Sequence, residues 1–211
     1  MELFRCANFV KLRSGHHDQC LWQDDEHLCV AQKRDQVNPA QLDKTLLWKV
    51  ELVNHPGDDG HEVAGNTAAI AIRLQSQNGL YLKASERRFL LGATGRKVTQ
   101  EAILSRVDAS CEWEASEVIN DIAGCSTAGG AGDGDDRSRF VKLRSKRYGT
   151  FLRANGGLPP YRNTVTHDVP WLGITQDSVI WEVEVVDFRI KKLASSILPP
   201  LRIIHVSQFI V

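Results

Sequence analysis

The chain alternates apolar and polar residues in short runs, and one of these runs occurs twice. The six residues FVKLRS stand at 9–14 and again at 140–145, and a looser version, IAIRLQS, stands at 70–76. Within each run the apolar residues lie two apart, which is the period of a β-strand that buries one face. The pattern therefore predicts three equivalent strands that lie far apart in the sequence.

The repeat extends well beyond these three strands. Each run ends in a serine, and a second leucine follows eight or nine residues after the leucine of the run. Each unit then reaches a tryptophan, and the distances from serine to tryptophan are 34, 37 and 36 residues. These tryptophans are Trp48, Trp113 and Trp181. Spacing this regular outweighs any local assignment of secondary structure.

Three β-rich units, none able to cover its own apolar face, are expected to close around a common pseudo-threefold axis. Closure removes exposed strand edges and gives a short barrel capped by hairpins. We therefore predict an all-β protein with one β-trefoil over residues 1–187, and with units at about 1–54, 66–120 and 138–187. The three tryptophans become equivalent core residues. Gly79 and Gly149 mark hairpin turns, because glycine adopts positive φ at low cost.

Two stretches fall outside the repeat. Residues 121–138, DIAGCSTAGGAGDGDDRS, are rich in Gly and Asp and are predicted to form a flexible linker. GGAGDG within this stretch lacks the strand, helix and Lys-Ser/Thr of a phosphate-binding loop. Residues 188–211 form a C-terminal tail with an apolar character, and the sequence predicts no definite structure for it.

Composition excludes several classes of protein. The 211 residues contain 26 basic and 26 acidic side chains, so no net charge draws the chain to nucleic acid, which is an unlikely partner. No apolar run approaches the ~20 residues of a membrane span, and the opening residues lack a secretory signal. Five scattered cysteines without a Cys-x-x-Cys pair indicate a reducing compartment. The expected location is the cytoplasm or the nucleus.

Three stretches together resemble a plant family of fascin-like β-trefoil domains. They are MELFRCANFVKLRSGHH at 1–17, FLRANGGLPPYRNTVTHDVP at 151–170 and QDSVIWEVEVVD at 176–187. The family is catalogued as a domain of unknown function and is often labelled actin cross-linking. The resemblance covers about residues 1–187 and implies the trefoil fold, with actin filaments as the partner.

Two constellations that suggest catalysis or metal binding do not match the required patterns. His16 and His17 stand near Cys20 and Cys29, but their spacing fits no standard zinc site. His167 precedes Asp168, yet no nucleophile motif accompanies the pair. We expect no enzyme activity, no metal and no cofactor.

Basic residues on the outward positions of the third unit are the candidate binding residues. Outward Lys and Arg are equally what a solvated strand face carries, but arginine pairs directionally with carboxylate or phosphate. A binding module for actin filaments is the first hypothesis. A trefoil that binds a sugar or a phosphorylated ligand is the alternative, although the Gln-x-Trp of ricin-type lectins is missing. A structural or stress-related interaction protein also fits. The candidate contact residues are Lys142, Arg144, Lys146, Arg147, Arg153, Arg162 and His167.

Overall fold

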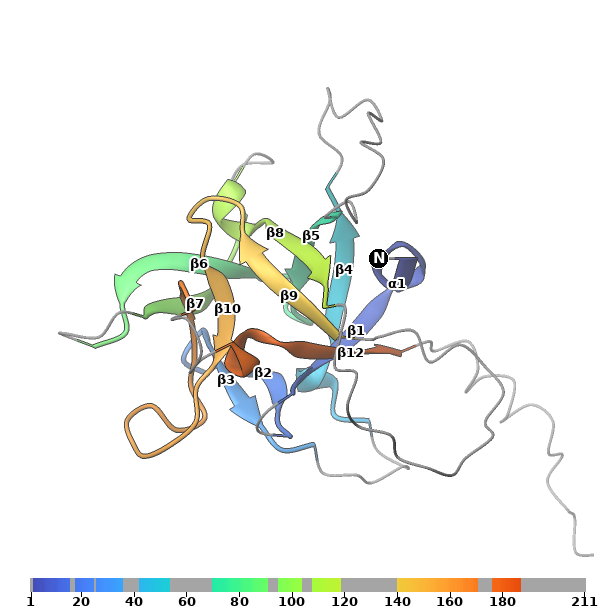
Figure 1. The fold of residues 1–211 in the computed structure, drawn as a ribbon. Coiled ribbons are helices and arrows are strands. Elements are labelled where there is room, and N and C mark those ends of the chain that lie inside the picture. The colour runs from blue at the N-terminus through green and yellow to red at the C-terminus, as the bar shows by residue number, and fades with distance from the viewer. Residues whose placement is uncertain are drawn as a thin grey trace, which may run out of the picture.

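The structure is a computed structural model, and it describes residues 2–15, 18–24, 26–35, 42–53, 70–90, 95–103, 108–118, 140–170 and 176–186. Within these ranges twelve strands form a single sheet that closes on itself (Figure 1). The predicted linker at 121–138 and the tail at 188–211 lie outside the described residues.

Each unit contributes four strands. The first unit holds β1 (Phe9–Ser14), β2 (Cys20–Asp24), β3 (Cys29–Lys33) and β4 (Trp48–Leu52). The second holds β5 (Ile70–Gln75), β6 (Tyr81–Arg88), β7 (Arg96–Glu101) and β8 (Trp113–Glu117). The third holds β9 (Phe140–Ser145), β10 (Phe151–Ala154), β11 (Val165–Asp168) and β12 (Trp181–Val186). A short 3-10 turn precedes the fourth strand of each unit: η1 (Lys44–Leu46), η2 (Ala109–Cys111) and η3 (Asp177–Val179).

The first and fourth strands of the three units form the barrel. Their antiparallel pairings run β1–β12–β9–β8–β5–β4 and return from β4 to β1. Six strands therefore close without a free edge, which removes the backbone groups that an open sheet would offer to other chains. The three copies of the opening strand motif are β1, β5 and β9.

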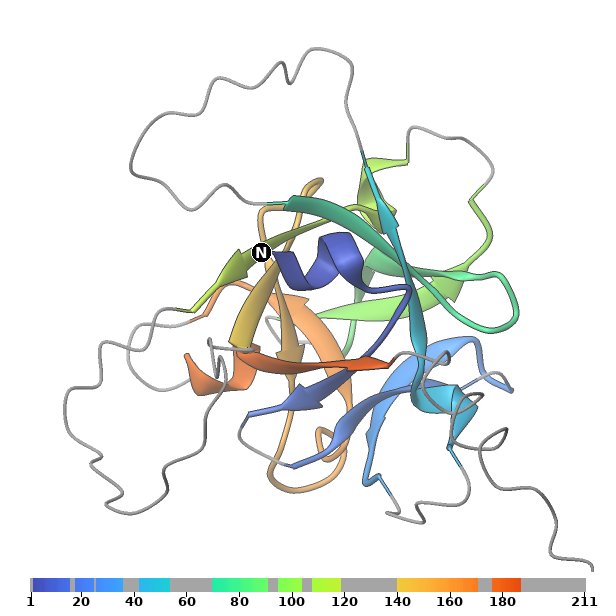
Figure 2. The ribbon, with the colours of Figure 1, turned by 90° about the vertical axis from the view of Figure 1, so that its right-hand side faces the viewer.

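The second and third strands of each unit form three hairpins that cap one end of the barrel. β3 pairs with β7 and β7 pairs with β11, while a bridge between Ala31 and Thr164 links the first and third hairpins. At the opposite end lies the helix α1 (Glu2–Cys6), which Figure 2 shows in front of the barrel. Its Phe4 is buried among the core residues, so this helix closes the second end.

The core repeats with the sequence. Trp48, Trp113 and Trp181 are fully buried, and the ring nitrogen of each donates to the carbonyl oxygen of the second-strand leucine of its own unit. The Nε1···O distances are 3.2, 3.0 and 3.0 Å, to Leu21, Leu82 and Leu152 respectively. A buried indole N–H costs free energy unless it finds an acceptor, and here each unit supplies the same one.

The all-β prediction is confirmed for the described residues, with α1 as an addition that the repeat did not predict. Residues 42–53 look helical when read alone, but they form η1 followed by the strand β4, as their place in the repeat requires. Gly79 and Gly149 have φ values of +78° and +65°. At Gly149 the positive φ is the reason that the turn needs glycine, since an added Cβ would meet only the flexible end of Arg144, with Nη2 3.0 Å away.

Candidate functional site

Three of the predicted binding residues are held in ion pairs with acidic residues of the second unit. Arg144 Nη1 lies 3.1 Å from Glu114 Oε2, and Arg147 Nη2 lies 3.1 Å from Glu86 Oε1. Lys146 Nζ lies 3.5 Å from Glu112 Oε2. Half of the six basic residues expected on this face are therefore compensated, by acids of the second unit that lie far away in the sequence.

The other predicted residues divide into two groups. Lys142, Arg153 and Arg162 have no acidic partner among the residues that the structure describes. His167 is fully buried and has no place on the surface. Lys11, which the alternation places outward, is also buried, and its Nζ lies 2.9 Å from Asp35 Oδ2.

His167 belongs to a ring of hydrogen bonds that joins the three hairpins. Its Nε2 donates to the carbonyl oxygen of Ser85 in the second unit at 2.8 Å, and Thr150 Oγ1 donates to Nδ1 at 2.7 Å. Since a carbonyl can only accept, Nε2 carries a proton, and because burial lowers the pKa of the ring below 6.5, the ring is neutral at pH 7 with Nδ1 as the acceptor. The ring of Tyr148 stacks on it with centroids 5.4 Å apart.

The equivalent residues of the other units complete this ring. Gln32 Nε2 donates to the carbonyl of Asn155 at 2.8 Å, and Gln100 Nε2 donates to that of Asp24 at 3.3 Å. The acceptors Asp24, Ser85 and Asn155 occupy the same position in the three units, three residues after the second-strand leucine. Each hairpin therefore holds the next one, and His167 has a structural role.

We expect His167 to make the protein sensitive to mild acid. Burial lowers its pKa below the ordinary value of 6.5, and the positive charge of Arg96 acts in the same direction. As the pH falls below about 6.5, the unfolded chain takes up a proton here that the folded chain does not, so the free energy of unfolding decreases. The decrease ends below the lowered pKa of the folded state.

The substitution His167→Gln tests this pH dependence. Glutamine fills the equivalent position in the first two units, so this variant is expected to fold and to lose the decrease in stability just below pH 6.5. Urea unfolding of both proteins between pH 5 and 8 measures the difference. Parallel pH profiles for the two proteins would show that His167 is not the titrating group.

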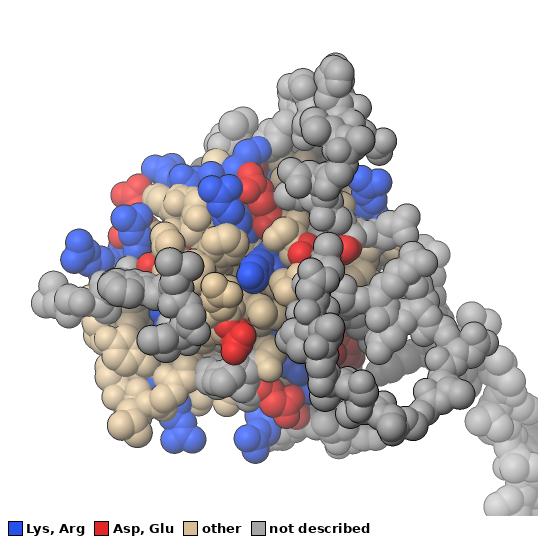
Figure 3. Space-filling view, in the orientation of Figure 1, with Lys and Arg blue, Asp and Glu red and all other residues tan. Residues whose placement is uncertain are grey.

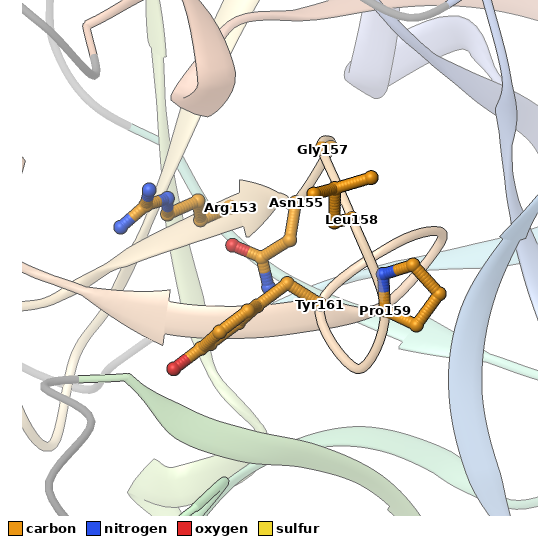
Figure 4. A pocket seen from close by; sticks show the side chains of 7 residues that line it. Arg153, Asn155, Gly157, Leu158, Pro159 and Tyr161 are labelled. Atoms are coloured by element: carbon orange, nitrogen blue, oxygen red, sulfur yellow. The ribbon is translucent and has the colours of Figure 1, made fainter.

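One pocket lies in the long turn between β10 and β11. It has a volume of about 540 Å³ and is lined by Arg153, Asn155, Gly156, Gly157, Leu158, Pro159 and Tyr161. Figure 4 shows the side chains of Arg153, Asn155 and Tyr161 around one side of the space, with Leu158 and Pro159 on the loop. The pocket thus combines a guanidinium, an amide, a phenol ring and aliphatic surface.

The lining residues are held in different ways. The Asn155 amide nitrogen donates to Oγ1 of Thr164 and Thr166 at 3.1 and 3.0 Å, so this side chain is fixed. The Tyr161 ring lies 5.8 Å from the ring of Phe89, yet 42% of the residue is exposed. Leu158 is 83% exposed. A large apolar side chain that stays in solvent beside a pocket provides surface for a ligand to cover.

A second group of basic residues lies on the β6–β7 hairpin. Among the described residues, Arg87, Arg88 and Lys97 have no acidic partner, and Arg88 stands directly opposite Arg96 across the two strands. Arg96 also lies over the ring of Tyr148, with Cζ 5.3 Å from the centroid. In Figure 3, basic side chains gather over the part of this face where Figure 1 labels β6 and β7. The run SERRFLLGATGRK carries this signal in the sequence, but the sequence interpretation placed the basic surface in the third unit.

The expectation of no metal stays a prediction, and the cysteines that the structure describes are free thiols. His16 and His17 lie outside the described residues, and no cluster of three or more His, Cys, Asp or Glu suited to a metal occurs within the described part. Cys20 and Cys111 are buried free thiols, and burial raises the pKa of each to about 11. Both therefore behave as small apolar residues at neutral pH. None of the described helices has the length and apolar character needed to cross a membrane.

The sequence matches a known family over most of its length. Residues 1–122 and 134–181 match the beta-trefoil domain of unknown function DUF569, and the chain belongs to this family. None of the curated proteins matches the chain.

Solved structures with a similar fold include a designed protein and two proteins that bind saccharides. The designed threefold-symmetric protein ThreeFoil is 15% identical, with a TM-score of 0.53, and the match covers 85% of this chain and 99% of that one. The Polyporus squamosus lectin, bound to the epitope Neu5Acα2-6Galβ1-4GlcNAc, is 18% identical with a TM-score of 0.51, covering 85% and 49%. SeviL bound to asialo-GM1 saccharide is 10% identical with a TM-score of 0.53, covering 86% and 99%. At these identities the likeness shows the β-trefoil fold.

Proposed function

We propose that this member of the β-trefoil family is a non-catalytic module that binds a saccharide in the pocket between β10 and β11. The observation that carries the proposal is the lining of the pocket. Tyr161 and Leu158 expose apolar surface, while Asn155 and Arg153 bring polar side chains to the same space. A sugar ring presents C–H groups on its faces and hydroxyl groups at its edge, so it needs both kinds of surface.

The size and rigidity of the pocket support this proposal. A volume of about 540 Å³ falls within the range of roughly 300–1,000 Å³ that is typical of small-ligand sites. The fixed amide of Asn155 reduces the conformational entropy that a ligand would have to overcome. Two of the similar structures, the Polyporus squamosus lectin and SeviL, hold saccharides on the same fold.

The residues around the pocket favour binding over catalysis. No carboxylate, imidazole or thiol belongs to the described lining of the pocket. His167 donates from Nε2 to a backbone carbonyl and accepts at Nδ1, so both of its nitrogens are engaged in the fold. General acid–base catalysis uses an imidazole or a carboxylate within reach of the substrate in most enzymes.

A glycan array tests saccharide binding directly, with wild type, Tyr161→Ala and Leu52→Ala compared at equal concentration. Leu52 is a matched control, because it is 44% exposed and lies on β4, outside the pocket. We expect wild type and Leu52→Ala to bind the same glycans, and Tyr161→Ala to lose about tenfold in affinity, since a stacked ring contributes up to about 1.5 kcal/mol. Failure of the wild-type protein to bind any glycan would reject the proposal, as would undiminished binding by Tyr161→Ala.

An acidic protein surface such as an actin filament is the second candidate partner. One observation favours it: Arg88 and Arg96 are directly opposite each other, and like charges in this arrangement cost free energy unless an anion lies nearby. Co-sedimentation with filaments would support this candidate if binding fell with added salt and with Arg87→Glu/Arg88→Glu. Reversal of Arg144, which is already paired with Glu114, serves as the control.

A further inference from the structure

One position in the trefoil is built differently in the third unit, and the difference lies at the pocket. The residue that follows the second-strand leucine is Trp22 in the first unit, Lys83 in the second and Arg153 in the third. The residue five positions before the core tryptophan is Asp43, Asp108 and Gln176 in the same order. In each unit the 3-10 turn that follows the second of these positions packs beside the second strand.

In the first two units the aspartate before the 3-10 turn forms an ion pair with a lysine of the hairpin. Lys83 Nζ lies 2.8 Å from Glu101 Oε2 and 3.6 Å from Asp108 Oδ2. In the first unit Lys33 takes the corresponding role, with Nζ 2.9 Å from Asp43 Oδ2 and 5.5 Å from the centroid of the Trp22 ring. The two aspartates also cap η1 and η2, because each carboxylate accepts from the backbone N–H two residues later.

In the third unit Gln176 replaces this aspartate, and the cation Arg153 has no acidic partner among the described residues. Gln176 makes no side-chain cap to η3, and Arg153 forms no ion pair with any described residue. Its Nε is buried without an acceptor. Asp168 occupies the position of Glu101 but forms no ion pair with Arg153; its Oδ1 accepts from the N–H of Val169, and its Oδ2 is buried without a donor.

This difference defines what a ligand has to supply. Buried polar groups in folded proteins nearly always have a partner, so an unpartnered guanidinium N–H beside a pocket indicates a place for an acceptor. The planar guanidinium matches a carboxylate, which accepts two parallel hydrogen bonds from it. Arg162, on the loop that forms the pocket, is exposed and has no acidic partner among the described residues, so it adds positive charge there.

We infer that the ligand is an acidic saccharide, whose carboxylate binds Arg153 in the place that an aspartate takes in the other two units. This inference rests on the proposed saccharide function and adds the charge of the ligand to it. The sugar ring lies against Tyr161, and the carboxylate points to the guanidinium across the floor of the same pocket. The first two units cannot bind a carboxylate in this way, because Lys33 and Lys83 are already paired with Asp43 and Asp108.

Matched pairs of sugars test the charge requirement. The probes are trigalacturonate with neutral trigalactose, and triglucuronate with triglucose, titrated by calorimetry into the full chain. We expect the acidic member of at least one pair to bind tenfold or more tightly than its neutral partner, and Arg153→Gln to abolish the difference. Arg153→Lys should retain part of it, and Lys83→Gln, the equivalent change in the closed second unit, should leave it unchanged.

The substitution Gln176→Asp provides the sharpest test, because it restores the acid that the other units have. We expect it to raise the midpoint of thermal unfolding by capping η3, and to lower the affinity for the acidic sugar tenfold or more. Higher thermal stability with undiminished binding would overturn the inference.

Different results would reject saccharide binding and the acidic charge of the ligand. Equal affinity for acidic and neutral sugars, lost in Tyr161→Ala but kept in Arg153→Gln, would leave the saccharide function standing and reject the acidic ligand. If neither member of any pair binds and the glycan array is also blank, both proposals are wrong.

Discussion

Replacing Trp113 by alanine is expected to lower the free energy of unfolding by about 3–5 kcal/mol, and Trp48→Ala and Trp181→Ala are expected to have effects of similar size. Each ring is fully buried, and each change leaves a cavity in the shared core. It also removes the donor to a second-strand carbonyl, which stays buried without that partner. Chemical denaturation of the purified variants measures the loss.

Trp22→Ala is the matched control for these three variants. Trp22 is a half-buried tryptophan on β2 that has no tryptophan at the equivalent position of the other units, and its ring contacts Lys33. We expect a clearly smaller loss of stability. If Trp22→Ala were as damaging as Trp113→Ala, the three tryptophans would not form the equivalent centre of the core, and the alignment of the units would have to be redrawn.

The second large effect is expected at a buried ion pair between β5 and the turn before β8. Arg73 Nη2 lies 2.6 Å from Glu112 Oε1, and the glutamate side chain is only 2% exposed. Arg73→Met removes the closest cation from a carboxylate that has little access to water, so we expect a loss of about 3 kcal/mol. The value lies near the low end for broken buried pairs because Lys146 stays 3.5 Å away.

A double variant separates the charge from the packing. The residues equivalent to Glu112, each just before the core tryptophan, are Leu47 and Ile180, so an aliphatic side chain suits this position. Arg73→Met/Glu112→Leu is therefore expected to recover at least half of the stability lost in the single variant. Strictly additive losses in the double variant would contradict the proposed pairing.

The fold could be read from the sequence because it depends on a spacing that occurs three times. The distances between the serine, the leucine and the tryptophan place the same side chains at the same points of three units, whatever the residues between them. For the same reason the turn at Gly149 and the strand character of residues 48–52 followed from the alignment of the units. Local preference alone would have assigned a helix to the second of these.

The charges were harder to predict because their partners belong to other units. Arg144 and Arg147 look free in the sequence, yet Glu114 lies opposite Arg144 on the neighbouring strand β8, and Glu86 reaches Arg147 from β6. His167 looks like a surface residue next to an aspartate, but its ring takes the place that Gln32 and Gln100 have in the other hairpins. Alternation along a strand gives the face of a residue, and contacts between units decide its partners.

The pocket could be predicted from the sequence only in part. The sequence interpretation named Arg153 and Arg162 among several basic residues, but it did not distinguish them from the paired ones. The distinguishing sign is present in the aligned units, where Asp43 and Asp108 correspond to Gln176. Its meaning depends on the contacts of Lys33 and Lys83, which no single sequence reveals.

We infer that, within the described part of the chain, only the third of the three equivalent hairpins has an open binding site. Nuclear magnetic resonance of the ¹⁵N-labelled chain, titrated with the acidic trisaccharide that binds most tightly, tests it most directly. We expect shifts in the backbone amides of residues 151–168 and in the Nε–Hε signal of Arg153, with the equivalent residues around Lys33 and Lys83 unchanged. Shifts of similar size in all three hairpins, or shifts confined to the β6–β7 hairpin, would contradict it.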